Sequence, residues 1–185
     1  MKIKLLEPIG VPAETIEEYA RKLTEMGHEF EWFDTVATDP KELAVRSAGS
    51  DIVMIANHPY PESVILSDQD LKMISVAFTG IDHVAAEACR EKGIMICNAA
   101  GYSNQTVAEL VIGMAVSGLR NIRKADIQLR KGGTSAGIGG REICGRTVGI
   151  IGLGRIGLMT AKLFLAFGAR VIAYGRSRSE EAEKK

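Results

Sequence analysis

The chain has 185 residues, of which 46% are hydrophobic and 25% are charged, so it can form a packed core and lacks the composition of a disordered protein. Its 23 Lys and Arg residues balance its 23 Asp and Glu residues, and the absence of a basic block argues against a nucleic-acid partner. No apolar run has the length of a membrane span, and the first residues do not resemble a signal peptide, so we expect a cytoplasmic protein with no membrane partner.

The first hundred residues alternate between short apolar runs and stretches with helical spacing. Residues 52–55 are apolar without a polar face, as expected for a strand that is buried on both faces. The alternation predicts an α/β fold with a doubly wound parallel sheet. The expected strands are residues 2–6, 29–33, 51–56, 73–78 and 94–97, and the expected helices are residues 12–26, 39–49, a short stretch ending at 65, and 84–92.

On the first expected helix, Ile16, Tyr19, Ala20 and Leu23 recur at helical spacing and are predicted to lie on one face, and on the second helix Leu43 and Val45 are apolar. The three cysteines form no C-x-x-C pair, and their odd number argues against a disulfide framework. We expect no metal site and interpret the cysteines as small core side chains. The three cysteines are Cys89, Cys97 and Cys144.

A long helix is predicted to begin near Ser103 and to continue to about Lys131. The glycine-rich residues 132–140 then predict a flexible connection to the last part of the chain. The long helix would carry a broad apolar stripe formed by Val107, Leu110, Val111, Met114 and Leu119.

A glycine-rich turn follows a second apolar run at residues 148–151, which is typical of a buried parallel strand. Gly152, Gly154 and Gly157 have the G-x-G-x-x-G spacing and lead into a helical pattern. Gly152 would allow the tight turn, Gly154 the close approach of a pyrophosphate, and Gly157 the close packing of helix on strand. Amides at a helix start favour an anion, so we prefer dinucleotide binding to a merely structural turn.

The helical pattern ends at Gly168, and residues 170–174 read as a second buried strand. An acidic residue that holds the ribose is expected about twenty residues past the glycines. Gly175 occupies that slot, and Arg176 and Ser177 follow it. A missing carboxylate beside arginines can accommodate a 2′-phosphate, but the arginines could equally be ordinary surface charges. NAD and NADP therefore both remain open as the cofactor.

Four stretches of the chain carry a family resemblance, and they include TGIDHV at 79–84, GIMICN at 93–98, VAE at 107–109 and GRTVGIIGLGRIG at 145–157. In this order they resemble the D-isomer-specific 2-hydroxyacid dehydrogenase family, and the resemblance covers nearly the whole chain. The resemblance implies a flavodoxin-like substrate domain at residues 1–101. It also implies an interdomain helix and the first half of a Rossmann cofactor domain at residues 102–185.

The activity implied by the resemblance is NAD(P)-dependent hydride transfer between a small 2-hydroxy acid and its 2-keto acid. The backbone amides of Thr79 and Gly80 would hold the substrate carboxylate, although a plain strand-to-helix turn is the alternative. Asn57 and His58 follow a strand and could line the substrate cleft or order their own loop. The residues implied to accompany the glycines at the cofactor are Thr106, Arg155 and Ile156.

The catalytic arginine, glutamate and histidine of the family lie beyond the second strand of its cofactor domain, whereas this chain ends at Lys185. His58 is the one local residue that could stand in as a proton donor, but we assign no catalytic residue. The chain by itself is therefore expected to be an inactive fragment. A non-catalytic nucleotide-binding or scaffold module is the alternative function.

Self-association is expected because the chain contains only the first half of a Rossmann sheet. Strand 170–174 or its neighbour would present unpaired backbone groups, and the long helix would expose its apolar stripe. We therefore expect a homo-oligomer, in which contacts between copies bury both features.

Overall fold

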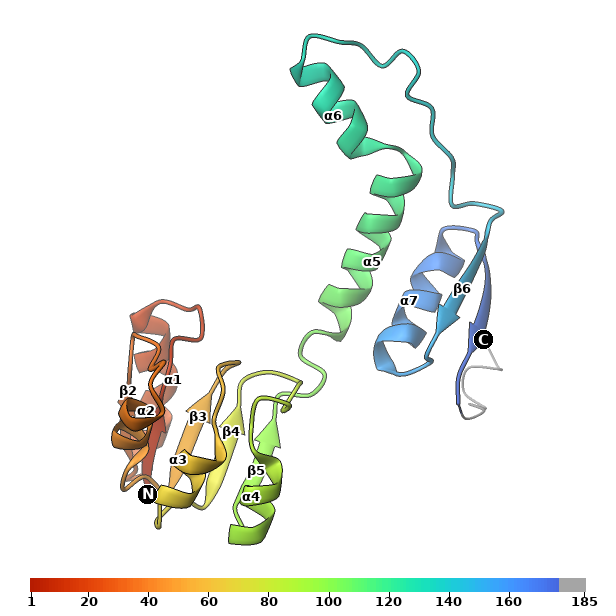
Figure 1. Ribbon diagram of the computed structural model, residues 1–185. Helices are drawn as coiled ribbons and strands as arrows, with labels where there is room; N and C mark the ends of the chain where they lie inside the picture. The colour runs from red at the N-terminus through yellow and green to blue at the C-terminus, as the bar shows by residue number, and fades with distance from the viewer. Residues whose placement is uncertain (177–185) are drawn as a thin grey trace. The chain divides into compact units, whose positions relative to one another are not determined.

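The computed structural model describes residues 1–176. The chain divides into two compact units, a first unit of Met1–Ala100 and a second unit that begins at Gly101 (Figure 1). In the described residues, no helix combines the length and the apolar character that crossing a membrane requires. Ser177, which is predicted to bind the cofactor, lies outside the described residues.

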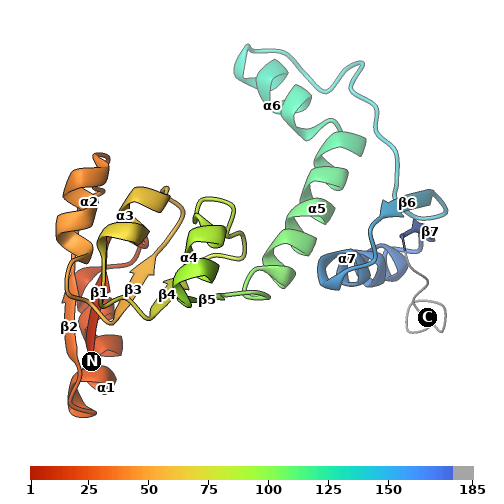
Figure 2. The same cartoon turned by 60° about the horizontal axis from the view of Figure 1, so that its bottom comes forward.

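The first unit is built around a five-stranded parallel sheet with the strand order β2-β1-β3-β4-β5, so the predicted doubly wound α/β fold is confirmed. Helices α2, α3 and α4 cover one face of this sheet, and α1 covers the other (Figure 2). The strands are β1 (Lys2–Leu5), β2 (Glu29–Trp32), β3 (Ile52–Ile55), β4 (Met73–Val76) and β5 (Met95–Asn98), and the helices are α1 (Ala13–Glu25), α2 (Pro40–Ser47), α3 (Glu62–Ser67) and α4 (Ala86–Lys92).

The central strands β3 and β4 supply the core, where Val53 and Ile74 are completely buried. Two apolar helical side chains are exposed, namely Val45 and Tyr19, which was predicted to share one face with Ile16 and Ala20. On α1, Ile16 and Ala20 are the buried residues, so the buried stripe runs from i to i+4 and passes beside Tyr19. Val45 lies two residues after the buried Leu43, which places it on the opposite side of α2.

The cysteines are all free, and the expectation that they fill the core is right only for Cys89. Cys97 is half-buried and Cys144 is exposed. Cys144 lies in the loop before the next strand, immediately after the buried Ile143, so its neighbour takes the core position.

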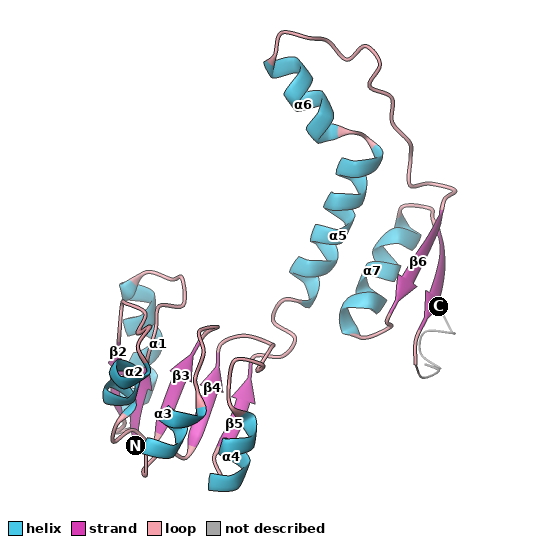
Figure 3. Cartoon of the chain, viewed as in Figure 1, coloured by secondary structure: helices cyan, strands magenta, loops and turns pink. Residues whose placement is uncertain are grey.

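The second unit contains a parallel pair of strands connected by a helix, and a helix that packs on that connection. Its small core is formed by Ile112, Ile143, Phe164 and Ala169. The connection between residues 131 and 146 has no regular secondary structure (Figure 3). The elements are α5 (Asn104–Leu119), α6 (Ile122–Arg130), β6 (Thr147–Ile151), α7 (Arg155–Ala166) and β7 (Arg170–Tyr174).

The prediction of a single long helix from Ser103 to Lys131 is wrong, because the helix is interrupted between α5 and α6. Asn121 has a φ of 52°, a left-handed conformation that a right-handed helix cannot continue through. Its side-chain Nδ2 donates to the carbonyl oxygen of Gly139 at 2.6 Å. The glycine-rich connection therefore folds back on the break and stabilises it.

The expectation of two buried strands in the second unit is also wrong. Ile151 at the end of β6 is 89% exposed, and Ile172 and Tyr174 on β7 are exposed as well. Within residues 1–176, β6 pairs only with β7, and the side chains that face α5 and α7 are the ones with partial burial. An apolar sequence makes a strand suitable for burial, but neighbouring strands and a second covering layer are needed to bury it.

Candidate functional site

The glycine turn between β6 and α7 has a geometry that depends on two of its glycines. Gly152 has a φ of 95°, a conformation that favours glycine, and its N–H donates to the carbonyl oxygen of Tyr174 at 2.7 Å. A Cβ added to Gly157 would overlap the carbonyl oxygen of Gly152 and approach Ile150 Cγ2 at 3.5 Å. The first turn of α7 therefore lies directly against the end of β6, and only glycine fits there.

The start of α7 is open to a ligand. Gly154 is the N-cap residue and no side chain caps the helix, while a Cβ added to Gly154 would meet no atom within 4 Å. The amides of Arg155, Ile156 and Gly157 have no acceptor within the helix, because the first N–H groups of any helix lack one. Their N–H groups and the helix dipole can together stabilise an anion such as a phosphate.

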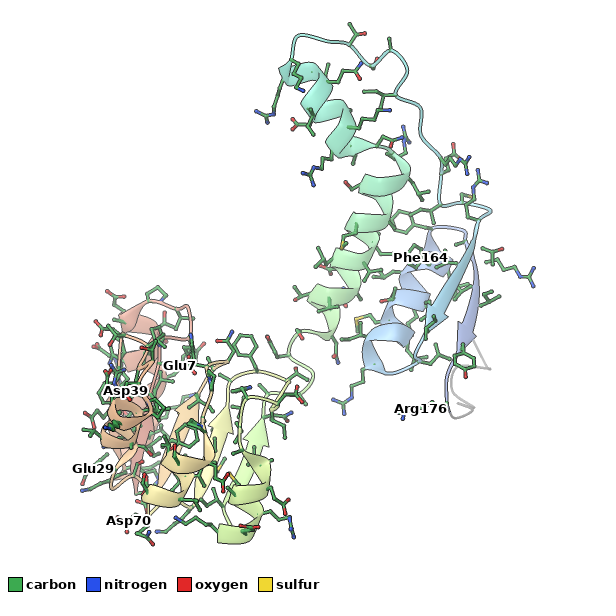
Figure 4. The ribbon with its side chains drawn as sticks, in the orientation of Figure 1. Glu7, Glu29, Asp39, Asp70, Phe164 and Arg176 are labelled. Atoms are coloured by element: carbon green, nitrogen blue, oxygen red, sulfur yellow. The ribbon has the colours of Figure 1, made fainter. Side chains whose placement is uncertain are left out.

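The other cofactor candidates in the second unit lie near this turn or follow the adjacent strand. Arg155 Nη1 would be 3.1 Å from a Cβ added to Gly101, so its guanidinium reaches the start of α5, where Thr106 lies exposed in the first turn. Tyr174 pairs with Ile151 in register, so Gly175 and Arg176 leave the sheet at the same edge as the glycine turn. Figure 4 shows Arg176 at the end of β7.

The substrate candidates follow adjacent strands of the first unit's sheet. Asn57 comes after β3, and Thr79 and Gly80 come after β4, whose register aligns Ile55 with Val76. All three candidates are exposed. Asn98 Nδ2 donates to the carbonyl oxygen of Thr79 at 2.7 Å, whereas the amides of Thr79 and Gly80 have no acceptor in the described part of the chain. These two free amides can receive a carboxylate.

The sequence interpretation missed a buried carboxylate at this edge, Glu7, which is labelled in Figure 4. Glu7 is 4% exposed, and its Oε1 accepts the N–H of Ala56 at 2.7 Å. Its Oε2 contacts His58 Nδ1, so the two side chains form a carboxylate–histidine pair. The available signal was its place directly after the first buried strand, because open α/β sheets bind ligands beyond the carboxyl ends of their strands.

The remaining histidines have different surroundings, and all three histidines belong to the first unit. His83 Nε2 is buried without a hydrogen-bond partner within residues 1–176, and its carbonyl oxygen accepts the N–H of Tyr60 at 2.8 Å. His28 Nδ1 lies 3.5 Å from the amino-terminal nitrogen of Met1, at the edge where the strands begin. In the described residues, no group of three or more His, Cys, Asp or Glu side chains could hold a metal ion.

The parallel sheet and the G-x-G-x-x-G turn define an α/β protein of the type that binds dinucleotides. Residues 10–184 match the family model described as D-isomer specific 2-hydroxyacid dehydrogenase, catalytic domain. The chain therefore belongs to the D-isomer-specific 2-hydroxyacid dehydrogenase family, and the resemblance found in the sequence is confirmed.

Individual relatives agree with this assignment. The chain is 37% identical to hydroxypyruvate reductase of Thermotoga maritima over 118 residues, which are 63% of this chain and 39% of the relative. An acyclic imino acid reductase solved with NADPH and D-Arg matches with a TM-score of 0.85 and 28% identity, over 98% of this chain and 59% of that one. NAD-dependent formate dehydrogenase of Staphylococcus aureus, solved with NAD, matches with a TM-score of 0.78 and 26% identity, over 95% and 56%. The chain thus spans well under two thirds of these relatives.

Proposed function

We propose that the chain forms part of an NAD(P)-dependent oxidoreductase that transfers a hydride between a small 2-hydroxy acid and its 2-keto acid. Family membership supports the reaction class. The observation that carries the proposal is the start of α7, which no side chain caps and which packs closely against Gly152 because residue 157 is glycine. We assign no catalytic residue in this chain, so the chain by itself is expected to bind cofactor without turnover.

The cofactor would place its pyrophosphate on the amides that follow Gly154, beside Arg155 and Ile156. Thr106 would lie near the nicotinamide. Gly175, Arg176 and Ser177 would meet the ribose, where the missing carboxylate leaves both NAD and NADP acceptable. The two solved relatives differ in the same respect, since one was solved with NADPH and the other with NAD.

The substrate would be bound through its carboxylate by the amides of Thr79 and Gly80, with Asn57 on the neighbouring loop. The relatives support a carboxylate ligand, because hydroxypyruvate, D-Arg and formate, which appear in their names and complexes, all contain this group. Substrate and cofactor would thus be held mainly by backbone N–H groups that each unit presents.

Calorimetric titration of the purified chain with NADH and with NADPH tests the proposal. Gly157→Ala is expected to abolish binding of either cofactor, because the added Cβ would displace the turn. Gly149→Ala on β6 is the matched control, since its Cβ would meet no atom within 4 Å and binding should persist. The proposal would be contradicted if the unaltered chain bound neither NADH nor NADPH, or if the chain alone turned over pyruvate.

We also propose that the protein forms a homo-oligomer through the second unit. Apolar side chains are exposed along α5 and α6, where a hollow of about 580 Å³ is present, and the lining of this hollow includes Met114 and Ile127. A second copy of the chain could cover these side chains. Light scattering is expected to report a dimer or larger species that Met114→Glu weakens; a monodisperse monomer would contradict this part.

A further inference from the structure

The Glu7–His58 pair connects two segments that are far apart in the sequence. Glu7 follows β1, whereas Ala56 and His58 follow β3. Oε1 of Glu7 accepts the N–H of Ala56 at 2.7 Å and that of His58 at 3.3 Å, and Oε2 contacts His58 Nδ1. These N–H groups satisfy a carboxylate that burial would otherwise penalise strongly. Glu7 therefore fixes both the loop after β3 and the ring of His58.

The pairing also determines which ring nitrogen of His58 is free. A carboxylate only accepts hydrogen bonds, so Nδ1 carries the hydrogen and Nε2 is left for another partner. The His58 side chain is 48% exposed, and its Nε2 makes no hydrogen bond within the described part of the chain. A neutral ring offers Nε2 only as an acceptor, whereas a protonated ring offers it as a charged donor.

His58 lies at the sheet edge that presents the two free amides. β3 and β4 are neighbours, and the loops that follow them are joined where the N–H of Tyr60 donates to His83 O at 2.8 Å and the N–H of Ala85 donates to Tyr60 O at 3.2 Å. The loop after β4 also carries Asp82, which is exposed. The titratable groups on the segments that follow β1, β3 and β4 are Glu7, His58, Tyr60, Asp82 and His83.

We propose that Glu7 and His58 form a proton-coupled contact for an anionic ligand beside the amides of Thr79 and Gly80, with 2-oxo acids as the ligand class. This proposal rests on the carboxylate site proposed above. His58 takes up one proton from solvent when the ligand binds, and its Nε2–H then donates to a ligand oxygen; the proton returns to solvent on release. Glu7 is the positioning residue, because it holds Nδ1–H and so directs the exchangeable proton to Nε2.

Nuclear magnetic resonance of the ¹⁵N-labelled chain tests the contact directly, with pyruvate as the probe. Titrations at about pH 5.5 and about pH 8 cover the range in which histidine ordinarily changes charge. Pyruvate should shift the amides of Thr79 and Gly80 together with the imidazole nitrogens of His58. Binding should be roughly tenfold tighter at the lower pH, because a protonated ring adds a charge-assisted donor to the contact.

Two variants separate the contact from a structural role. His58→Gln keeps a neutral donor, so pyruvate should still bind but with an affinity that no longer depends on pH. Glu7→Gln turns an amide N–H toward Nδ1, which moves the hydrogen of the neutral ring to Nε2; the imidazole ¹⁵N shifts should report this exchange, and binding at about pH 8 should improve. His28→Gln, at the opposite edge of the sheet, should change nothing.

The outcomes distinguish this proposal from the function on which it rests. Amide shifts at Thr79 and Gly80 that are equal at both pH values, and unchanged in His58→Gln, would overturn the proton-coupled contact and leave the carboxylate site standing. If these amides shifted at neither pH, both the proton-coupled contact and the carboxylate site would be overturned. Cofactor binding at the glycine turn is measured separately and would not be affected by that result. Should Glu7→Gln fail to fold, the His58→Gln titration alone still decides between these results.

Discussion

The sheets of the two units have similar strands and very different burial. Val53 and Ile74 in the first unit are completely buried, whereas Ile151 in the second is 89% exposed, although all three lie in apolar parallel strands. In the first unit the central strands have a neighbour on each side, and Val53 and Ile74 pack against buried side chains of α2, α3 and α4. Burial is thus a property of the assembled layers, and an apolar strand acquires it only from its neighbours.

The units also differ in how they present groups to a ligand. At the carboxyl edge of the first sheet, side chains from three strand ends organise the surface, namely Glu7, His58 and Asn98. In the second unit the backbone of the glycine turn forms the surface that a ligand would meet, and position 157 has room for glycine alone. The first arrangement depends on pairs distant in the sequence, and the second on a short local motif.

Substitution of matched isoleucines should have the largest effect on stability. Ile74→Ala is expected to lower the free energy of unfolding by about 2–5 kcal/mol, because a completely buried side chain leaves a cavity. Ile172→Ala on the half-exposed β7 should cost less than about 1 kcal/mol. Urea unfolding followed by circular dichroism measures both. Equal losses at the two positions would contradict the difference in burial between the sheets.

Asn121→Ala, at the break between α5 and α6, should lower the free energy of unfolding by about 1–2 kcal/mol. Alanine has a Cβ but no short polar side chain, so it is strained at a φ of 52°. Part of this cost is the lost hydrogen bond to Gly139. Thermal unfolding of the second unit provides the measurement, with Asn121→Gly as the variant that relieves the strain and loses only the hydrogen bond. Asn121→Gly should therefore be the milder of the two, and the reverse order would exclude backbone strain as the cause.

The smallest effect is expected from removing a hydroxyl group. Tyr60→Phe should cost about 1 kcal/mol at neutral pH, because Tyr60 is buried and its hydroxyl shares a 2.6 Å hydrogen bond with Ser47 Oγ. Burial also raises the pKa of Tyr60 above its ordinary value. An unfolded tyrosine ionises near pH 10, so the stability that the neutral hydroxyl contributes is complete below about pH 10 and is lost as the pH rises further.

Alkaline unfolding curves measure this pH dependence. Tyr60→Phe should flatten the loss of stability above about pH 10, whereas Tyr174→Phe, which alters an exposed side chain of the second unit, should leave the curve unchanged. An identical alkaline loss in the Tyr60→Phe variant would show that another group is responsible.

The sequence by itself determined the order of strands and helices along the first unit, the parallel sheet of that unit, the turn at Gly152 and the family. These features depend on local patterns, namely the spacing of apolar side chains and the positions where glycine is needed. Dependence on local patterns also explains the error at Tyr19, because the apolar character of one helical side chain does not determine where the buried stripe of that helix ends.

Only the tertiary structure decided which apolar strands are buried, where the long helix breaks, and which polar groups meet. Glu7 and His58 are 51 residues apart, and they are brought together because β1 and β3 are neighbours in the sheet. The break at Asn121 is held in the same way by Gly139 from a distant part of the connection. Such contacts depend on strand order and packing between segments, which no local spacing of residues encodes.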